Sequence, residues 1–396
     1  MSFKVAIGRS QKKDISDAAQ EAAISCLSRL DPREAGLAIL FTTPEYASIG
    51  LLKKINSILK ADIPLIGCCG SAVFSSYGAQ KEGIILMLIA CARIRISSAA
   101  FDLSQNADVY AAAQNLSAQL LSQLKGQHRE TGLLFSSGSA RNTSAHIKGL
   151  QNILGKSFPF IGAGANTGQN SASGYLYSNQ NILGQGISAA LFAGKFSYGI
   201  GLRHGWRPLG KLRAVSESSG NLIKSIDGLP ARRLYEDYFA KNADGLNTEL
   251  AHINTLYPIG IRIEGENEYL LRSIISFNPD GSLLTQGDIP QGSQIRLMIA
   301  TKESCLESSR QAALQAKIAL KNKIMDFALV ISSSSRYHLL GRNASQEIQI
   351  IKEALGDDIP FAGFYSFGEY APLGSANYYG QTYFHNQSLA ILGMGE

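Results

Sequence analysis

Apolar and polar positions along the chain repeat in one order: a short apolar strand, an amphipathic helix, a second strand, a second helix and two further strands. In the first unit, strands at Val5–Ile7 and Leu37–Phe41 flank a helix that is expected from about Asp14 to Leu30. The next segment places apolar residues at the spacing of one helix face, at Ile49, Leu52, Ile55 and Leu59. The second unit repeats this order from Ile94, with a helix expected near Val109–Leu124.

A short motif marks the same position in every unit. An apolar residue is followed by a proline, two apolar residues and a glycine, at Pro64–Gly67, Pro159–Gly162 and Pro360–Gly363. Pro64 and Pro159 are 95 residues apart (159 minus 64), which we take as the length of the unit. We expect the motif to build a strand and its exit.

The third unit is expected to begin only at Ile295, after an interruption. Residues 195–293 show short alternating strands, hairpin-turn signals at Ser218–Asn221 and Asn278–Gly281, and one helix at Ala231–Phe239. This pattern predicts an antiparallel layer that lies against the third unit. The expected division is therefore residues 1–93, 94–194, 195–293 and 294–396.

The order of elements also indicates the fold class. Two strand-helix-strand crossings per unit favour parallel neighbours, and the last strand-turn-strand connection favours an antiparallel addition. The prediction is an α/β fold with three repeated strand-helix-strand-helix-strand-strand units, mixed sheets and a β-rich insert before the third unit.

Composition narrows the class of protein. The 396 residues are 45% hydrophobic and 17% charged, an ordinary globular mixture, and the formal charge of +6 is not gathered into the basic runs that a nucleic-acid surface needs. The longest apolar runs, such as Ile84–Ala92, are about half the length of a membrane span of roughly 20 residues. The N-terminal residues lack a signal-peptide core, and the five cysteines lack disulfide-like spacing. We expect a cytoplasmic protein without a nucleic-acid partner or a membrane span.

Several kinds of chemistry lack the residues that they need. The six histidines form no His-x-x-x-His pair and the cysteines no Cys-x-x-Cys pair, so we expect no metal and no cofactor. No Gly-x-Ser-x-Gly nucleophile elbow is present, and no catalytic residue is assigned. The segment Gly162–Gly168 follows a strand as a phosphate loop does, but no helix pattern comes after it, so a glycine-rich turn is the favoured interpretation.

Pairs of small hydroxyl residues end the middle strand of each unit, at Thr42-Thr43, Ser136-Ser137 and Ser332-Ser333. They indicate a repeated structural position. Capping of the helix that follows accounts for them.

The third unit carries the main candidate site. Arg336 lies just past a strand end, Tyr365 and Glu369 follow the Pro-x-x-Gly motif, and His385 with Asn386 precedes the closing strand. If the strands are neighbours, these loops converge at one edge of the sheet. A guanidinium for a carboxylate and a carboxylate for an ammonium are what an amino-acid-like ligand requires.

An alternative for the same residues is a salt bridge between Arg336 and Glu369 that only braces the loops. Arg272 and Trp206 are secondary candidates, because an arginine and an aromatic wall suit an anionic or planar ligand. A lone tryptophan is also a common part of a core.

Several separated motifs resemble the FIST family, in order and over nearly the whole chain. They are Pro64–Cys68, Gly205–Gly210, Asp227–Ala231 with Tyr235, Tyr257–Gly260 with Arg272, Gly287–Gly292, Ser335-Arg336, Gly363–Tyr365, Phe367–Glu369 and His385–Gln387. The resemblance implies an N-terminal half over residues 1–194 and a C-terminal half over residues 195–396. It also implies a sensory module that binds a small ligand, such as an amino acid or a small carboxylate, in signal transduction.

The chain departs from the family pattern at three points. It shows no kinase, cyclase or signalling coiled coil, so we expect a separate output protein as partner. The segment Cys68–Val73 lacks the Gly-Glu that the family often shows there, and serines occupy positions 332–335, where the family often places a cysteine. Two other functions stay open: a small-molecule enzyme with His385 and Glu369 as acid and base, and a scaffold whose exposed sheet edge pairs with a partner.

Overall fold

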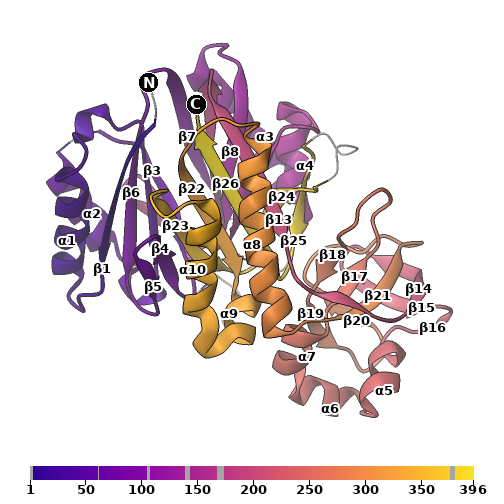
Figure 1. Cartoon of the computed structure of the whole chain (residues 1–396). Coiled ribbons are helices and arrows are strands. Elements are labelled where there is room, and N and C mark those ends of the chain that lie inside the picture. Colours follow the sequence, from indigo (N-terminus) through magenta and orange to yellow (C-terminus); the bar gives the residue numbers. More distant parts are fainter. Residues whose placement is uncertain (1–2, 61, 105–107, 139–142, 167–173, 375–379) are drawn as a thin grey trace.

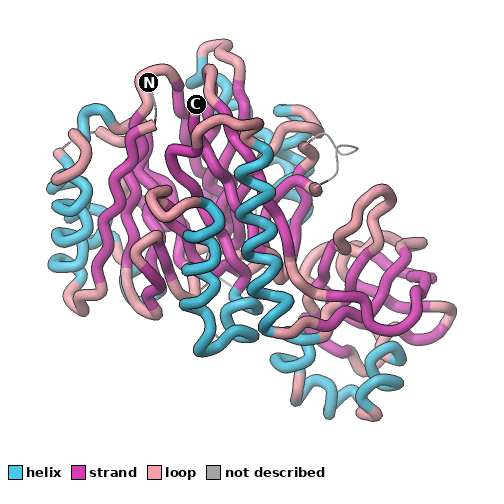
Figure 2. The backbone as a smooth tube through the Cα atoms, in the orientation of Figure 1, coloured by secondary structure: helices cyan, strands magenta, loops and turns pink. Residues whose placement is uncertain are grey.

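The protein consists of three strand-and-helix units around a common core and an antiparallel insert beside them (Figures 1 and 2). The computed structural model describes residues 3–60, 62–104, 108–138, 143–166, 174–374 and 380–396. Part of the glycine-rich segment Gly162–Gly168 lies outside the described residues. Within the described residues, no helix has the length and apolar character to cross a membrane.

The elements of the first two units follow the expected order. The first unit contains β1 (Lys4–Ser10), α1 (Ile15–Leu27), β2 (Leu37–Thr42), α2 (Ile49–Leu59), β3 (Leu65–Cys69), β4 (Val73–Ser75), β5 (Gly78–Gln80) and β6 (Ile84–Ala90), with 3-10 turns at Pro32–Glu34 and Pro44–Tyr46. The second contains β7 (Ile94–Asp102), α3 (Val109–Leu124), β8 (Arg129–Ser136), α4 (Thr143–Leu154), β9 (Phe160–Gly164), β10 (Leu176–Ser178), β11 (Asn181–Leu183) and β12 (Gly186–Gly194).

The third unit is split by the insert. Its elements are β13 (Ser197–Arg203), α8 (Lys302–Ala319), β22 (Met325–Ser333), α9 (Ser334–Leu340), a 3-10 turn (Gly341–Asn343), α10 (Ala344–Leu355), β23 (Phe361–Ser366), β24 (Glu369–Pro372), β25 (Thr382–His385) and β26 (Leu389–Gly395). The insert contains β14 (Arg207–Ser219), β15 (Leu222–Ile226), β16 (Leu229–Pro230), α5 (Arg233–Phe239), α6 (Ala243–Thr248), α7 (Leu250–Leu256), β17 (Ile259–Ile261), β18 (Leu270–Arg272), β19 (Ile274–Phe277), β20 (Leu283–Thr285) and β21 (Gln294–Ile299).

Local sequence sets several helix ends. Asp14 accepts a hydrogen bond from the N–H of Asp17 at the start of α1, and Ser48 does the same for α2. Thr301 and Ser304 form a reciprocal capping box at the start of α8. Each cap satisfies backbone donors that have no partner inside the helix.

The three sheets share one topology. In each unit the last strand lies between the first and second strands and is antiparallel to both, and the third strand is parallel to the second. The remaining hairpin of each unit joins the sheet of another unit. The first unit's β4–β5 pairs with β23 of the third unit, the second unit's β10–β11 pairs with β3 of the first, and the third unit's β24–β25 pairs with β9 of the second. The predicted α/β class with repeated units and mixed sheets is confirmed, and the exchanged hairpins connect the units in a closed cycle.

A central core lies where the three sheets face one another. Phe41, Phe135 and Phe364 come from three different units, and their ring centroids are 4.8 to 6.1 Å apart. On the outer faces, α1 and α2 cover the first sheet, α3 and α4 the second, and α8 and α10 the third. The ends of the strands, rather than the middle of this core, are therefore where a ligand can reach the units.

The glycine of the Pro-x-x-Gly motif allows two strands to approach closely. A Cβ on Gly67, Gly162 or Gly363 would lie 1.9, 1.7 or 1.9 Å from a carbonyl oxygen of the neighbouring parallel strand. No real Cβ sits at such a distance from backbone. The motif is therefore part of the architecture of all three units.

Replacing Gly162 by alanine is expected to destabilise the protein by about 3 kcal/mol, because the added methyl group overlaps the backbone of Leu134. Urea unfolding of the full chain measures the loss. Gly184→Ala is the control, since Gly184 is exposed with no atom within 4 Å of the added carbon, and its stability should stay within about 1 kcal/mol of the parent. Equal losses in the two variants would contradict this explanation of the motif.

The insert forms one antiparallel sheet, as expected, with three short helices beside it (Figure 1). Sequence analysis predicted one of them, at Ala231–Phe239, where α5 lies; α6 and α7, of six and seven residues, were not predicted.

The structure also differs in the first strand of the third unit. The segment at Ile295 is β21, which pairs with β14 and β17 inside the insert, whereas β13 pairs with β26. β13 contains Gly199 and Gly201, which lie against the backbone of α8, so its apolar signal is weak.

Candidate functional site

A cavity of about 480 Å³ lies between the third unit and the insert. Ser333, Ser334 and Ser335 line it from the end of β22 and the start of α9. The opposite wall belongs to the insert and includes Asn254, Thr255, Ser273 and Gln286. The volume is typical of sites for small molecules.

The hydroxyl residue that ends the second strand is bound alike in the first two units. Thr42 hydrogen bonds to the hydroxyl of Tyr177, and Ser136 to the hydroxyl of Tyr370. Both tyrosines come from the exchanged hairpins and lie opposite the motif glycines in register. This hydroxyl position is thus structural in both units.

The third unit breaks this pattern. Phe74 occupies the tyrosine position opposite Gly363, and it has no hydroxyl to offer. Ser332 instead donates to the carboxylate of Glu347, which also accepts from Tyr365. A buried acid therefore replaces the tyrosine in this unit.

The next hydroxyl shows a second difference. In the first two units, Thr43 accepts a hydrogen bond from the N–H of Gly83, and Ser137 from that of Gly186, at the start of the closing strand. Both contacts are 3.1 Å long and tie two strands together.

At the matching place in the third unit, the N–H of Ser388 donates to Glu369 at 3.0 Å. The backbone pairing is the same as in the other units, since the N–H of Ser333 still donates to the carbonyl of Ser388. Glu369 thus accepts this N–H in place of Ser333, whose side chain hydrogen bonds to Glu369, and Ser333 lines the cavity. Ser333 also caps α9, because its oxygen accepts from the N–H of Ser335 at 3.4 Å.

Glu369 is fully buried behind this wall. Burial raises the pKa of its carboxyl from 4.5 to about 8, against the lowering effects of Ser366, the Ser388 N–H, the charge of Arg336 and Ser333. The hydroxyl of Ser366 donates to its other oxygen at 2.7 Å. Near neutral pH this acid is largely protonated, so the wall beside Ser333 carries little charge.

Arg336 does not line the cavity. Its side chain is fully buried and pairs with Glu347 at 2.7 Å, rather than with Glu369 as the salt-bridge alternative supposed. Further donations go to the carbonyls of His204 and Cys305 and to the hydroxyls of Ser308 and Ser309. Arg336 connects α9 with α8, α10 and the start of the insert, and Tyr365 belongs to the same buried network through Glu347.

His385 and Glu369 lie opposite each other on β25 and β24, but neither lines the cavity. Burial lowers the pKa of His385 to about 3, and its Nε2 contacts the carbonyl oxygen of Ala371 at 3.0 Å. This arrangement does not support an acid–base pair that acts on a substrate in the cavity.

The residues after His385 join the two walls of the cavity. Asn386 accepts from the N–H of Ser273 at 3.0 Å, and the side-chain amide of Gln387 donates to the carbonyl of Asn254. From the other side, Gln286 donates to the carbonyl of Phe367 at 3.1 Å. These contacts position the insert wall against the third unit.

Arg272 and Trp206 lie in the interior. Arg272 is buried and donates to the carbonyls of Asp288, Leu271 and Phe384, and burial lowers its pKa to about 10. Trp206 packs in the apolar cluster between the insert and α8 and α9. Neither lines the cavity.

The insert residues Asn254, Thr255, Ser273 and Gln286 were missed by sequence analysis. They occupy short polar segments without a motif, and only the packing of the insert brings them to the third unit. The serines at positions 332–335 did carry a signal, since they were noted as a departure from the family pattern.

The fold and cavity define a three-unit α/β protein with a polar site for a small molecule at the joint with an insert. Residues 36–229 match the FIST N domain, and residues 231–372 match the FIST C domain. The chain belongs to the FIST family, whose domains are sensor domains in signalling.

Two mycobacterial proteins are similar over part of their length. An uncharacterised protein of Mycobacterium tuberculosis is 21% identical over 221 residues, which make up 55% of this chain and 57% of that protein. One from Mycobacterium bovis is 23% identical over 225 residues, 55% of this chain and 56% of that protein. The chain spans a little over half the length of these curated relatives.

Among solved structures, a cyanuric acid hydrolase has a TM-score of 0.38 and 6% identity, with 99% of this chain and 100% of that chain covered. The cyanuric acid hydrolase from A. caulinodans has the same TM-score and 9% identity, with 98% of each chain covered. This similarity is too low to support a shared function.

Proposed function

We propose that the chain is a sensory module that binds a small, neutral, polar molecule in the cavity between the third unit and the insert. The observation that carries this proposal is the position of Ser333 in the cavity wall, because the equivalent residues Thr43 and Ser137 accept from the N–H that begins the closing strand and so hold two strands together. In the third unit this N–H donates to Glu369, and Ser333, which caps α9, is the residue that lies in the wall of the cavity.

The chemistry of the walls supports a neutral ligand. Most of the described residues that line the cavity carry a hydroxyl or amide group, and His338 is the one titratable residue among them. Partial burial lowers the pKa of His338, which favours its neutral form. The charged pair expected for an amino acid is not offered here, since Arg336 is engaged with Glu347 and Glu369 is buried.

A ligand that hydrogen bonds to both walls would change how the insert sits on the third unit. The contacts of Asn386, Gln387 and Gln286 carry such a shift to the loops at the ends of β23 and β25. A separate output protein that reads this shift completes the proposed signalling role.

A thermal-shift panel on the full chain tests the proposal. Small ureas, amides and sugars are compared with amino acids and small carboxylates, and a compound at one hundred times its Kd stabilises the fold by about 2.7 kcal/mol. We expect members of the neutral group to bind. Ser333→Ala and Thr255→Val should each weaken binding about fivefold, since one lost hydrogen bond costs about 1 kcal/mol.

Ser122→Ala is the control for these variants, because Ser122 is an exposed serine of α3 whose hydroxyl donates to the carbonyl of Gln119 in its own helix. It should leave binding unchanged. Binding restricted to charged compounds, or equal binding by Ser333→Ala and the parent, would overturn the assignment.

A further inference from the structure

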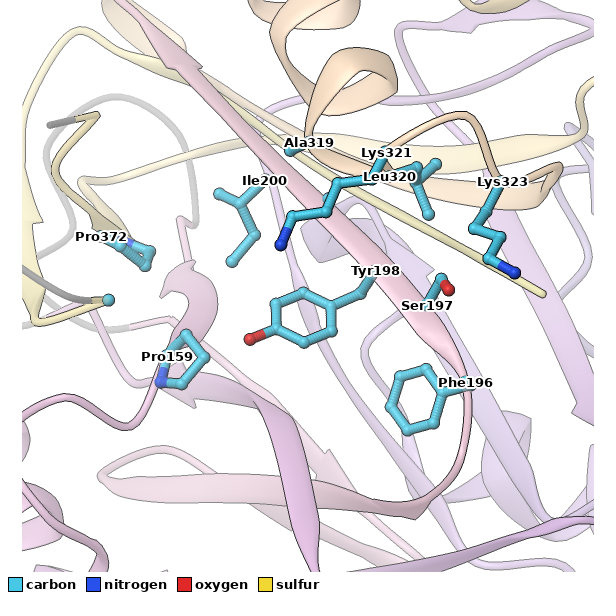
Figure 3. Close-up of a pocket in the computed structure, with 12 residues that line it drawn as sticks. Pro159, Phe196, Ser197, Tyr198, Ile200, Ala319, Leu320, Lys321, Lys323 and Pro372 are labelled. Atoms are coloured by element: carbon cyan, nitrogen blue, oxygen red, sulfur yellow. The ribbon is translucent and has the colours of Figure 1, made fainter. Parts of the chain in front are cut away.

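A second cavity follows the free edge of β13. β13 is the outermost strand of its sheet and pairs with β26 on one side. Along the other side runs a cavity of about 480 Å³ lined by the consecutive residues 196–200 (Figure 3). Five consecutive lining residues mean that the cavity runs parallel to the strand for about 15 Å.

The backbone of β13 offers hydrogen-bonding groups to this cavity. The N–H of Leu202 donates to the side chain of Gln315, and its carbonyl accepts from Arg203, so both groups of Leu202 point away from β26. Because these directions alternate along an antiparallel strand, Ile200 and Tyr198 turn their N–H and C=O to the same side. Among the described residues, no hydrogen bond to those two groups is found.

The backbone groups along the outer edge of β13 are bound at Leu202 and unpaired by any described strand at Ile200 and Tyr198. Gln315 and Arg203 occupy the backbone groups of Leu202, which prevents pairing beyond that residue. At Ile200 and Tyr198 no described strand pairs with the edge, although exposed edges in soluble proteins are normally covered, shortened or charged. An edge that no described strand pairs, and that lies along a cavity, therefore indicates a site for an added strand.

The rim of the cavity is basic. Lys321 and Lys323 stand above the strand, and Figure 3 shows the amine of Lys321 reaching over the ring of Tyr198. A neighbouring cavity of about 440 Å³ shares Tyr198 and Pro159 and adds Lys156. Its acidic lining residue, Glu130, pairs with His128.

We propose that the free edge of β13 binds an acidic, extended segment of a partner protein by strand addition. The main chain of the segment pairs with Tyr198 and Ile200, and its carboxylates lie near Lys321 and Lys323. Backbone pairing supplies affinity, and the charges select the partner and speed its association. The site is separate from the cavity at Ser333 and does not depend on a ligand there.

Fluorescence anisotropy with a labelled eight-residue peptide of alternating glutamate and valine tests this site on the full chain. We expect saturable binding that weakens at least tenfold in the double variant Lys321→Glu/Lys323→Glu. Lys12→Glu/Lys13→Glu is the matched control, because it changes the net charge equally at two exposed lysines before α1. Ser333→Ala should bind the peptide as the parent does.

Two N-methylated peptides separate strand addition from plain charge attraction. One peptide is methylated on the backbone nitrogens of its glutamates and the other on those of its valines. Each peptide therefore lacks the N–H groups along one edge of its extended chain. We expect one of the two to lose binding and the other to keep it. Loss in both, loss in neither, no binding of the parent peptide, or equal weakening by the two charge-reversed variants would overturn the proposal.

Discussion

Arg336→Met is expected to lower the free energy of unfolding by about 3 to 5 kcal/mol, because it leaves the carboxylate of Glu347 buried without its partner. Both side chains are fully buried, so water cannot replace the lost ion pair. The carbonyls of His204 and Cys305 lose a donor in the same step. Urea unfolding at neutral pH measures the effect.

Two further variants show whether the ion pair is the cause. Glu347→Met added to Arg336→Met removes the stranded charge and should recover a large part of the loss. Arg33→Ala breaks the exposed pair with Asp31, 2.6 Å long, and should not change stability measurably, since water solvates both groups. If Arg336→Met unfolds no more easily than Arg33→Ala, the buried ion pair and its hydrogen bonds do not stabilise the fold.

The case of Arg336 shows how far sequence alone leads at the site. Sequence analysis singled out this arginine by its place after a strand end and offered ligand binding or a brace. The structure shows a salt bridge, but the partner of Arg336 is Glu347, one turn into α10. Side-chain direction on a helix as short as α9 depends on its packing, which no local pattern records.

The repeat was accessible from sequence because it rests on local rules. Helix caps, apolar faces and the Pro-x-x-Gly motif recur in each unit and are visible in the residues themselves. The exchange of hairpins was not accessible, since β4, β10 and β24 pair with strands of other units. Such pairings depend on contacts far apart in the chain, and alternation within three or four residues cannot specify the partner.

The three units differ in what their strand-end hydroxyls contact, and neither the motifs nor the family pattern predicts this difference. The strand-end hydroxyls looked alike in sequence and were attributed to helix caps. In the structure, the hydroxyls of the first two units hold strands together, whereas in the third unit Ser332 binds Glu347, and Ser333 caps α9 and lines the cavity. The difference depends on Phe74, Glu347 and Glu369.

Glu369→Gln is expected to change how stability depends on pH. Folding raises the pKa of this carboxyl from 4.5 to about 8, so between these values the folded state binds more protons than the unfolded state. Stability from this group is therefore fully present below about pH 4.5 and is lost as pH rises toward 8. Each pKa unit is worth about 1.4 kcal/mol, which sets an upper limit of about 5 kcal/mol for the loss.

Glutamine imitates the protonated acid, since its amide oxygen can accept from the N–H of Ser388 and its amide nitrogen can donate to Ser366. Unfolding in urea from pH 5 to pH 9 should show the parent losing stability relative to Glu369→Gln as pH rises. Glu353→Gln, at an exposed position of α10, should follow the parent curve. Parallel curves for the parent and Glu369→Gln would mean that the acid behind Ser333 is not held protonated, and a neutral ligand would then lose its electrostatic basis.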